Sequence, residues 1–183
     1  MIYYIADMHF GHENVIRFDN RPFADTEEMD KCMISYWNSR VTNNDTVYIL
    51  GDIFWGNEKL SIKIINQLKG HKILIKGNHD RVSRQLQQHY DEIMDYAEIS
   101  DNKHFVVLSH YPIIFYKNQH RGAIMLYGHV HNTKEWDMIE KWKQEQLNAD
   151  IPCKLINVGC MMSYMNYMPR TLDEILRATD CKN

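Results

Sequence analysis

The stretch Ile2-Tyr3-Tyr4-Ile5-Ala6-Asp7-Met8-His9 is an apolar run that stops at an acidic residue and a histidine. Its apolar part predicts a short buried strand, because strands covered on both faces are continuously apolar. The arrangement recurs along the chain, where further apolar runs end at Gly51-Asp52, Gly77-Asn78-His79-Asp80, His110 and Gly128-His129-Val130-His131. The pattern predicts several strands that carry polar, metal-ligating residues at their carboxyl ends.

The residues between these runs predict alternating strands and helices. The apolar runs predict strands over about 2–6, 46–50, 72–75, 104–109, 123–127 and 154–158. Helical spacing and capping residues predict four helices. The first starts at Asp25 or Thr26 and ends near residue 41, and the second spans about 60–68 and closes at Gly70. The third spans about 82–89, and the fourth opens at the capping box Thr171-Leu172-Asp173-Glu174. Residues 134–148 are helical or irregular. This order predicts one α/β domain over residues 1–183.

The composition and net charge limit which functions and cellular locations we expect for this protein. The chain of 183 residues is 44% hydrophobic and 25% charged, an ordinary globular balance. A net charge of -3 and a pI near 6.3 argue against a protein that grips long nucleic acid. Four scattered cysteines without a Cys-x-x-Cys pair predict reduced thiols. A strand starting at Ile2 leaves no room for a signal peptide, and no apolar run could span a bilayer, so we expect a cytoplasmic protein.

The polar residues at the strand ends are suited to holding two cations. Loops at the carboxyl ends of strands converge in open α/β sheets, so segments distant in sequence can meet there. Asp7 and His9 are separated by one residue, as are His129 and His131, and an extended backbone would point each pair to one side. Asp52 offers two oxygens and could bridge two cations about 3.5–4 Å apart.

The ligand types indicate the metal and the chemistry. Mixed nitrogen and oxygen ligands suit Mn, Fe, Zn or Ni better than Mg or Ca. Two carboxylates among several neutral ligands leave a positive centre that attracts phosphate oxygens. Such a centre also lowers the pKa of bound water and provides hydroxide as a nucleophile. The sequence therefore predicts a hydrolase that uses a pair of divalent metal ions.

The ordered set Asp-x-His, Gly-Asp, Gly-Asn-His-Asp, His and Gly-His-x-His, running from Asp7 to His131, resembles the calcineurin-like metallophosphoesterases. The block spacing is similar to that of compact bacterial and phage members. The segments Asp7–Asn14, 157–159 and 169–174 also resemble that subgroup. The resemblance implies a sandwich of two mixed β-sheets flanked by helices.

The resemblance also implies roles for the matching positions. It assigns the first metal to Asp7, His9, Asp52 and His131, and the second to Asp52, Asn78, His110 and His129, with Mn as the favoured ion. His79 would lie on the substrate side, where an imidazole can stabilise charge or protonate the leaving oxygen. Asp80 would orient His79, although its sequence position is equally that of a helix N-cap.

Several other residues are candidates for contact with the substrate. His12, Asn14 and Arg17 follow the first motif, and His12 could instead bond only to backbone. Arg21 is a candidate phosphate clamp, although most arginines lie in solvent. The pair Phe54-Trp55 is either a wall for a nucleoside or acyl group or part of the core.

The run Met161-Met162-Ser163-Tyr164-Met165-Asn166-Tyr167-Met168 has no assigned chemistry. Methionine is adaptable and common at forgiving surfaces. The run is therefore a substrate-side loop, a subunit contact or an internal packing segment.

The expected function is hydrolysis of a small phosphodiester by metal-bound hydroxide, with His79 aiding the leaving group. A nucleotide is one candidate substrate. The alternatives are a nucleotide pyrophosphohydrolase or a phosphomonoesterase. A binding module on a degenerate scaffold should lack a ligand or the histidine, and all of them are present. A nuclease acting on polymers is disfavoured by the acidic pI.

Overall fold

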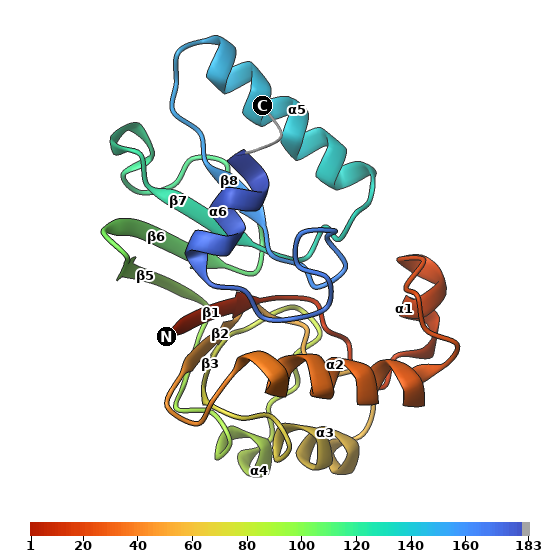
Figure 1. Ribbon diagram of the computed structural model, residues 1–183. Coiled ribbons are helices and arrows are strands. Elements are labelled where there is room, and N and C mark those ends of the chain that lie inside the picture. Colours follow the sequence, from red (N-terminus) through yellow and green to blue (C-terminus); the bar gives the residue numbers. More distant parts are fainter. Residues whose placement is uncertain (181–183) are drawn as a thin grey trace.

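Two four-stranded sheets face each other in the computed structural model, which describes residues 1–180 (Figure 1). The first sheet has the order β1 (Ile2–Ile5), β2 (Thr46–Ile49), β3 (His71–Ile75), β4 (Glu92–Met94), and the second has the order β5 (Tyr96–Asp101), β6 (His104–Ser109), β7 (Ile124–Tyr127), β8 (Leu155–Asn157). All neighbours in the first sheet are parallel, whereas β5 runs antiparallel to β6 in the second. The predicted α/β sandwich of two sheets flanked by helices is confirmed, but only the second sheet is mixed, because every pairing in the first sheet is parallel.

Helices cover the outer faces of both sheets (Figure 1). The helices are α1 (Glu13–Phe18), α2 (Thr26–Arg40), α3 (Glu58–Ile65), α4 (Arg84–Gln87), α5 (Lys134–Asn148) and α6 (Leu172–Asp180), with a short 3-10 helix, η1, at Gln119–Arg121. Figure 1 shows α2, α3 and α4 outside the first sheet and α5 outside the second. Residues 134–148, which the sequence left as helical or irregular, are helical.

The apolar runs are continuous because both faces of the second sheet are buried. In β6, Val106 and Leu108 join the large cluster between the sheets, while Val107 joins a smaller cluster on the opposite face. Trp136 and Trp142 of α5 pack on that smaller cluster. Successive strand residues point to opposite faces, so each face needs its own apolar cover.

Local capping signals place two of the helices as predicted. Asp25 is the N-cap of α2, and its side chain accepts a hydrogen bond from the Glu28 N–H. At α6, the Thr171 N–H donates to the Glu174 carboxylate, and the Glu174 N–H donates to the Thr171 hydroxyl. This reciprocal pair is a capping box.

Other elements differ from the sequence prediction. The sequence did not predict helix α1 or strands β4 and β5. Helix α3 ends at Ile65 rather than near residue 68, and α4 spans only Arg84–Gln87 rather than about 82–89. Helix α1 buries only Val15, and β5 alternates between exposed and half-buried residues at a sheet edge, so neither contains a continuous apolar run. Gly70 follows the turn after α3 with a φ of 88°, and so does not cap the helix directly.

The methionine- and tyrosine-rich run is an internal packing segment. Met161, Met162, Met165 and Tyr167 are buried in the large cluster. Of the three readings left open, the structure selects core packing.

Two further expectations concern thiols and membranes. Cys32, Cys153 and Cys160 are free thiols, and Cys181 lies outside the described residues. Within residues 1–180, every helix is too short or too polar to traverse a bilayer.

Candidate metal centre

Six predicted ligands form two clusters at the carboxyl ends of the strands. In each cluster the candidate ligand atoms all lie within 4.8 Å of one another. The first cluster is Asp7, His9 and His131, and the second is Asp52, His110 and His129. Asn78, which follows β3, joins the second cluster, since its Oδ1 lies 3.0 Å from Nε2 of His110.

The backbone at these ligands is left-handed rather than extended. Positive φ values occur at Asp7 (55°), His9 (51°), Asp52 (53°), His129 (70°) and His131 (48°). The prediction that an extended backbone points alternate residues to one side is therefore wrong, although the side chains do converge. Such conformations cost on the order of 1–3 kcal/mol each and cluster at functional sites. Backbone hydrogen bonds from Asp7 to Gly51 and from His9 to Asp52 hold the first two in place.

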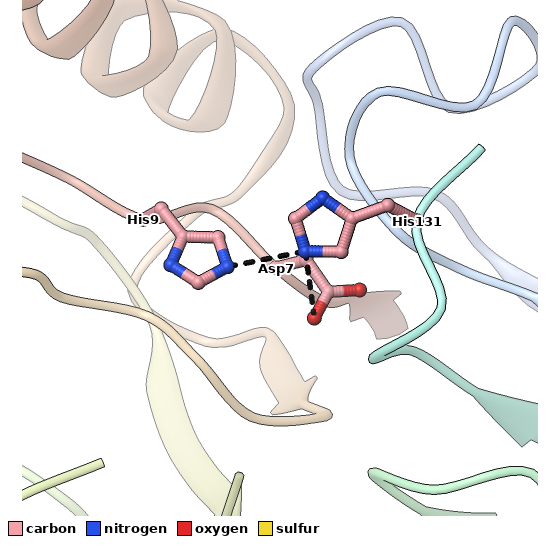
Figure 2. A group of neighbouring side chains, drawn as sticks. All are labelled: Asp7, His9 and His131. Carbon is pink, nitrogen blue, oxygen red and sulfur yellow. Dashed lines mark hydrogen bonds and ion pairs between the residues drawn. The ribbon is translucent and has the colours of Figure 1, made fainter. Parts of the chain in front are cut away.

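In the first cluster, two imidazoles and a carboxylate point at one another (Figure 2). Nε2 of His9 lies 3.2 Å from Nε2 of His131, which is 4.0 Å from Oδ1 of Asp7. Nδ1 of His131 lies 2.8 Å from the Asp19 carboxylate, so Nδ1 carries the proton. In the neutral ring, Nε2 then presents its lone pair to the cluster.

In the second cluster, two hydrogen-bond acceptors face each other. Nδ1 of His110 lies 2.8 Å from the Leu50 carbonyl oxygen, which only accepts, so Nδ1 is the donor. Nε2 of the neutral ring is then an acceptor that faces Oδ1 of Asn78 and lies 3.6 Å from Oδ2 of Asp52. Facing lone pairs repel unless a cation lies between them, so this geometry fits a metal ion.

Asp52, a member of the second cluster, also lies close to the first cluster. Its Oδ2 is 3.8 Å from Nε2 of His9 and 3.6 Å from Nε2 of His110. One carboxylate therefore reaches a histidine of each cluster, as a bridging ligand would.

When no cation is bound, burial determines the protonation of Asp7 and His9 in the first cluster. It raises the pKa of Asp7 to about 6, although His131 and His110 oppose this shift. It also lowers the pKa of His9 to about 2, with the nearby His131 adding to the effect. His9 is therefore neutral and ready to bind metal, and a cation would favour ionised Asp7.

A buried ion pair, which the sequence did not indicate, supports the first cluster. Arg21 donates to the Asp19 carboxylate and to the backbone carbonyls of Asp7 and Met8. Burial opposes ionisation of Asp19, but its contacts with His131 and Arg21 win and lower its pKa. Arg21 is only 4% exposed, so the prediction that it clamps phosphate is wrong.

Asp80 joins two of the ligand loops through backbone groups. Its carboxylate accepts hydrogen bonds from the N–H groups of Asp52, Gly77 and Ile53. Ser83 is the N-cap of α4, so Asp80 does not cap that helix. His79, which precedes Asp80 in the chain, donates its backbone N–H to Oδ1 of Asp52.

Two glycines allow the loops to approach the ligands. A Cβ at Gly128 would lie 2.6 Å from Oδ2 of Asp7, and one at Gly77 would collide with the Asp52 carboxylate. Only glycine lets the backbone come this close to a carboxylate.

His79 lies in an aromatic group at the exposed side of the centre. Its ring is edge-on to Trp55, with ring centroids 4.7 Å apart, and Trp55 stacks on His12 at 4.1 Å. Trp55 is 39% exposed while Phe54 is buried, so the structure divides this pair between site and core. Asn14 and Arg17 are exposed on α1, and their contact with substrate stays a prediction.

Residues 1–156 match the family model described as calcineurin-like phosphoesterase. The chain belongs to this family. An uncharacterized protein of Methanocaldococcus jannaschii is 31% identical over 180 residues, which cover 96% of this chain and 89% of the relative. The Gene 66 protein of Mycobacterium phage D29 is 27% identical over 159 residues, covering 72% and 78%.

A solved structure has the same overall fold. The crystal structure of a protein of unknown function from Aquifex aeolicus superposes with a TM-score of 0.72 at 26% identity, covering 97% of this chain and 98% of that one. The family predicted from the motifs is therefore confirmed, and this calcineurin-like phosphoesterase carries two candidate sites for the divalent metals that the family uses.

Proposed function

We propose that this calcineurin-like phosphoesterase hydrolyses a small phosphodiester with two divalent transition metal ions, Mn being the favoured ion. The position of Asp52 Oδ2 carries the proposal, because it lies within 4 Å of a histidine nitrogen in each cluster. Asp7, His9 and His131 would complete one site, and Asn78, His110 and His129 the other. The mixed nitrogen and oxygen donors suit such ions.

The metal pair, when bound, supplies positive charge for the phosphate oxygens and acidifies the attacking water. The chain's own residues supply orientation. Asp80 and the Asp52 carboxylate together hold the backbone that carries His79. The two buried acids Asp7 and Asp52 keep the net charge of the centre moderate.

His79 is the proposed general acid. Its side chain is exposed next to the centre and outside both ligand clusters. A protonated imidazole there can give its proton to the leaving oxygen as the bond from phosphorus to that oxygen breaks. Such proton transfer contributes typically about 10²–10⁴-fold to rate.

Two substitutions separate metal binding from proton transfer. Asp52→Ala should abolish both Mn²⁺ loading and turnover of bis-p-nitrophenyl phosphate. His79→Ala should keep two Mn²⁺ per chain and lose about 10²–10⁴-fold in turnover of a diester with an alkyl leaving group. The loss of turnover should be smaller for bis-p-nitrophenyl phosphate, because p-nitrophenolate departs without needing a proton.

Metal content is measured by elemental analysis, and turnover with Mn²⁺ against EDTA. His120→Ala, at an exposed histidine outside both clusters, is the matched control. Equal metal loss in Asp52→Ala and His79→Ala would contradict the division of roles. Faster hydrolysis of p-nitrophenyl phosphate than of the diester would contradict the preference for diesters.

A further inference from the structure

The chain crosses from the second sheet to the first at residues 157–160, beside the first cluster. The Ala6 N–H donates to the Val158 carbonyl oxygen, and the Cys160 N–H donates to the Ala6 carbonyl oxygen. Ala6 immediately precedes the candidate ligand Asp7. Residues 157–160, which we call the crossing segment, therefore lie next to the first cluster, although they contribute no member to either cluster.

Asn157, the first residue of the crossing segment, contacts the loop that carries His131. Its side chain is buried, with 1% exposed. Its Nδ2 donates a hydrogen bond of 2.7 Å to the His131 carbonyl oxygen, and its Oδ1 accepts one of 2.8 Å from the Gly159 N–H. A backbone N–H only donates and a carbonyl oxygen only accepts, so the two contacts fix which way the amide points. Both ends of this buried amide are thus used on backbone groups.

The backbone of His131 needs such support because it is left-handed, with a φ of 48°. This conformation is unfavourable for a residue with a Cβ and persists only where the surroundings hold it. Nδ1 of the ring is held by Asp19 at 2.8 Å, and Nε2 points toward the other two members of the first cluster (Figure 2). The Asp19 contact fixes the rotation of the ring, whereas the Asn157 contact fixes the backbone from which the ring extends.

Gly159 leaves the space that this arrangement needs. A Cβ at this position would lie 3.0 Å from Oδ1 of Asn157 and 3.1 Å from Oδ2 of Asp7. Glycine therefore lets the crossing segment pass close to both side chains. One short segment thus supports two members of the first cluster, because it packs beside Asp7 and holds His131 through Asn157.

We propose that Asn157 is a positioning residue for the metal ion of the first cluster, and that it acts by holding the backbone of His131. Within residues 1–180, the side chain of Asn157 hydrogen-bonds to His131 and Gly159 and to no member of the second cluster. The effect of Asn157 is therefore confined to the first cluster. The inference rests on the metal ligands of the proposed function and is independent of which ester is hydrolysed.

Asn157→Ala tests the inference in two backgrounds, each of which leaves one cluster intact. In His110→Ala the first cluster is intact, and adding Asn157→Ala should weaken Mn²⁺ binding about 10–100-fold, the usual effect of removing a residue that supports a metal ligand. In His9→Ala the second cluster is intact, and adding Asn157→Ala should leave the Mn²⁺ affinity unaltered. Calorimetric titration of the metal-free full chain measures these affinities, and circular dichroism confirms that each variant is folded.

Asn38→Ala is the matched control. The Asn38 side chain also donates to a backbone carbonyl oxygen, that of Gln67, and accepts from a backbone N–H, that of Lys69. It lies on α2 and outside both clusters, so its removal should leave Mn²⁺ binding unchanged. Asn157→Ser is a milder second variant. Its hydroxyl ends one bond short of the amide nitrogen, so it should weaken binding at the first cluster in the same way.

The dependence of activity on Mn²⁺ is a readout that a general loss of structure would not produce. Asn157→Ala changes neither a ligand nor the proposed general acid, so saturating Mn²⁺ should restore turnover of bis-p-nitrophenyl phosphate. The Mn²⁺ concentration that gives half-maximal turnover should rise about 10–100-fold.

Equal weakening of Mn²⁺ binding in the two backgrounds would overturn the inference, since it would show damage to the whole centre. Unchanged affinity of the first cluster in both Asn157→Ala and Asn157→Ser would overturn it too. Selective weakening at the first cluster, in a protein that hydrolyses no diester, would leave the role of Asn157 standing and overturn the proposed function. Diester turnover with an unaltered Mn²⁺ dependence in Asn157→Ala would do the reverse.

Discussion

At the scale of single residues, Asp19 connects the candidate metal ligand His131 to the buried Arg21. Its carboxylate accepts from Nδ1 of His131 and from Arg21, and Arg21 in turn donates to the carbonyl oxygens of Asp7 and Met8. Carboxylates behind ligating histidines fix the tautomer and the ring orientation. Asp19 is thus a positioning residue that acts through His131, and its buried charge is balanced by Arg21.

Asp19→Asn should weaken Mn²⁺ binding about 10–100-fold, because the amide no longer holds the His131 tautomer by charge. Calorimetric titration of the metal-free protein measures this affinity, and circular dichroism confirms that the variant is folded. Asp137→Asn, at an exposed acid on α5, is the matched control. In a His131→Ala background, Asp19→Asn should change the affinity little. A full additional loss there would show that Asp19 does not act through His131.

At the scale of elements, α2 holds the loop that follows the first motif. The Asp30 carboxylate, on α2, accepts a hydrogen bond of 3.0 Å from the Gly11 N–H. Burial raises the pKa of Asp30 from 3.8 to about 6, outweighing this hydrogen bond and the charge of Arg21. Helix α2 thereby anchors the turn just after His9, at the cost of a partly buried acid.

Asp30→Asn should change how stability depends on pH. A carboxyl whose pKa is raised on folding binds more protons in the native state between pH 3.8 and 6. The free energy of unfolding therefore falls as pH rises through this window. The neutral variant escapes this fall and should gain about 1–2 kcal/mol on wild type between pH 4 and 7, allowing for partial exposure.

Urea unfolding of the metal-free proteins at several pH values measures the effect. Glu27→Gln, at an exposed acid on the same helix, should leave the pH dependence between pH 4 and 7 close to that of wild type. Parallel pH curves for wild type and Asp30→Asn would refute the assignment.

At the scale of the whole molecule, the centre joins both sheets. Asp7, Asp52 and Asn78 follow strands of the first sheet, while His110, His129 and His131 follow strands of the second. Ions held between these loops would tie the two sheets together, and a ligand that binds only the folded state stabilises it.

Removal of metal should therefore lower the melting temperature. At free Mn²⁺ about 100 times the dissociation constant, one site adds about 2.7 kcal/mol, which is about 5–11 °C for a chain of this size. Scanning calorimetry with Mn²⁺ and with EDTA measures the shift. Asp52→Asn should lose most of it because both sites use this residue. A shift retained in full by Asp52→Asn would argue that Mn²⁺ binds elsewhere.

The sequence by itself determined the α/β class, the strands next to the motifs, the family and the six residues that cluster as candidate metal ligands. Those features depend on local patterns, namely apolar runs that end at His and Asp and capping residues such as Asp25. The edge strand β5 escaped prediction because half of it faces solvent and no apolar run marks it.

Only the tertiary structure decided what surrounds the ligands. It placed Arg21 behind the candidate metal centre rather than on a phosphate, and it set the Asp80 carboxylate on three backbone N–H groups. It also revealed left-handed backbone where the alternating pattern suggested extension. These outcomes depend on contacts between residues far apart in the chain, and no local pattern of residues encodes which distant group a side chain will meet.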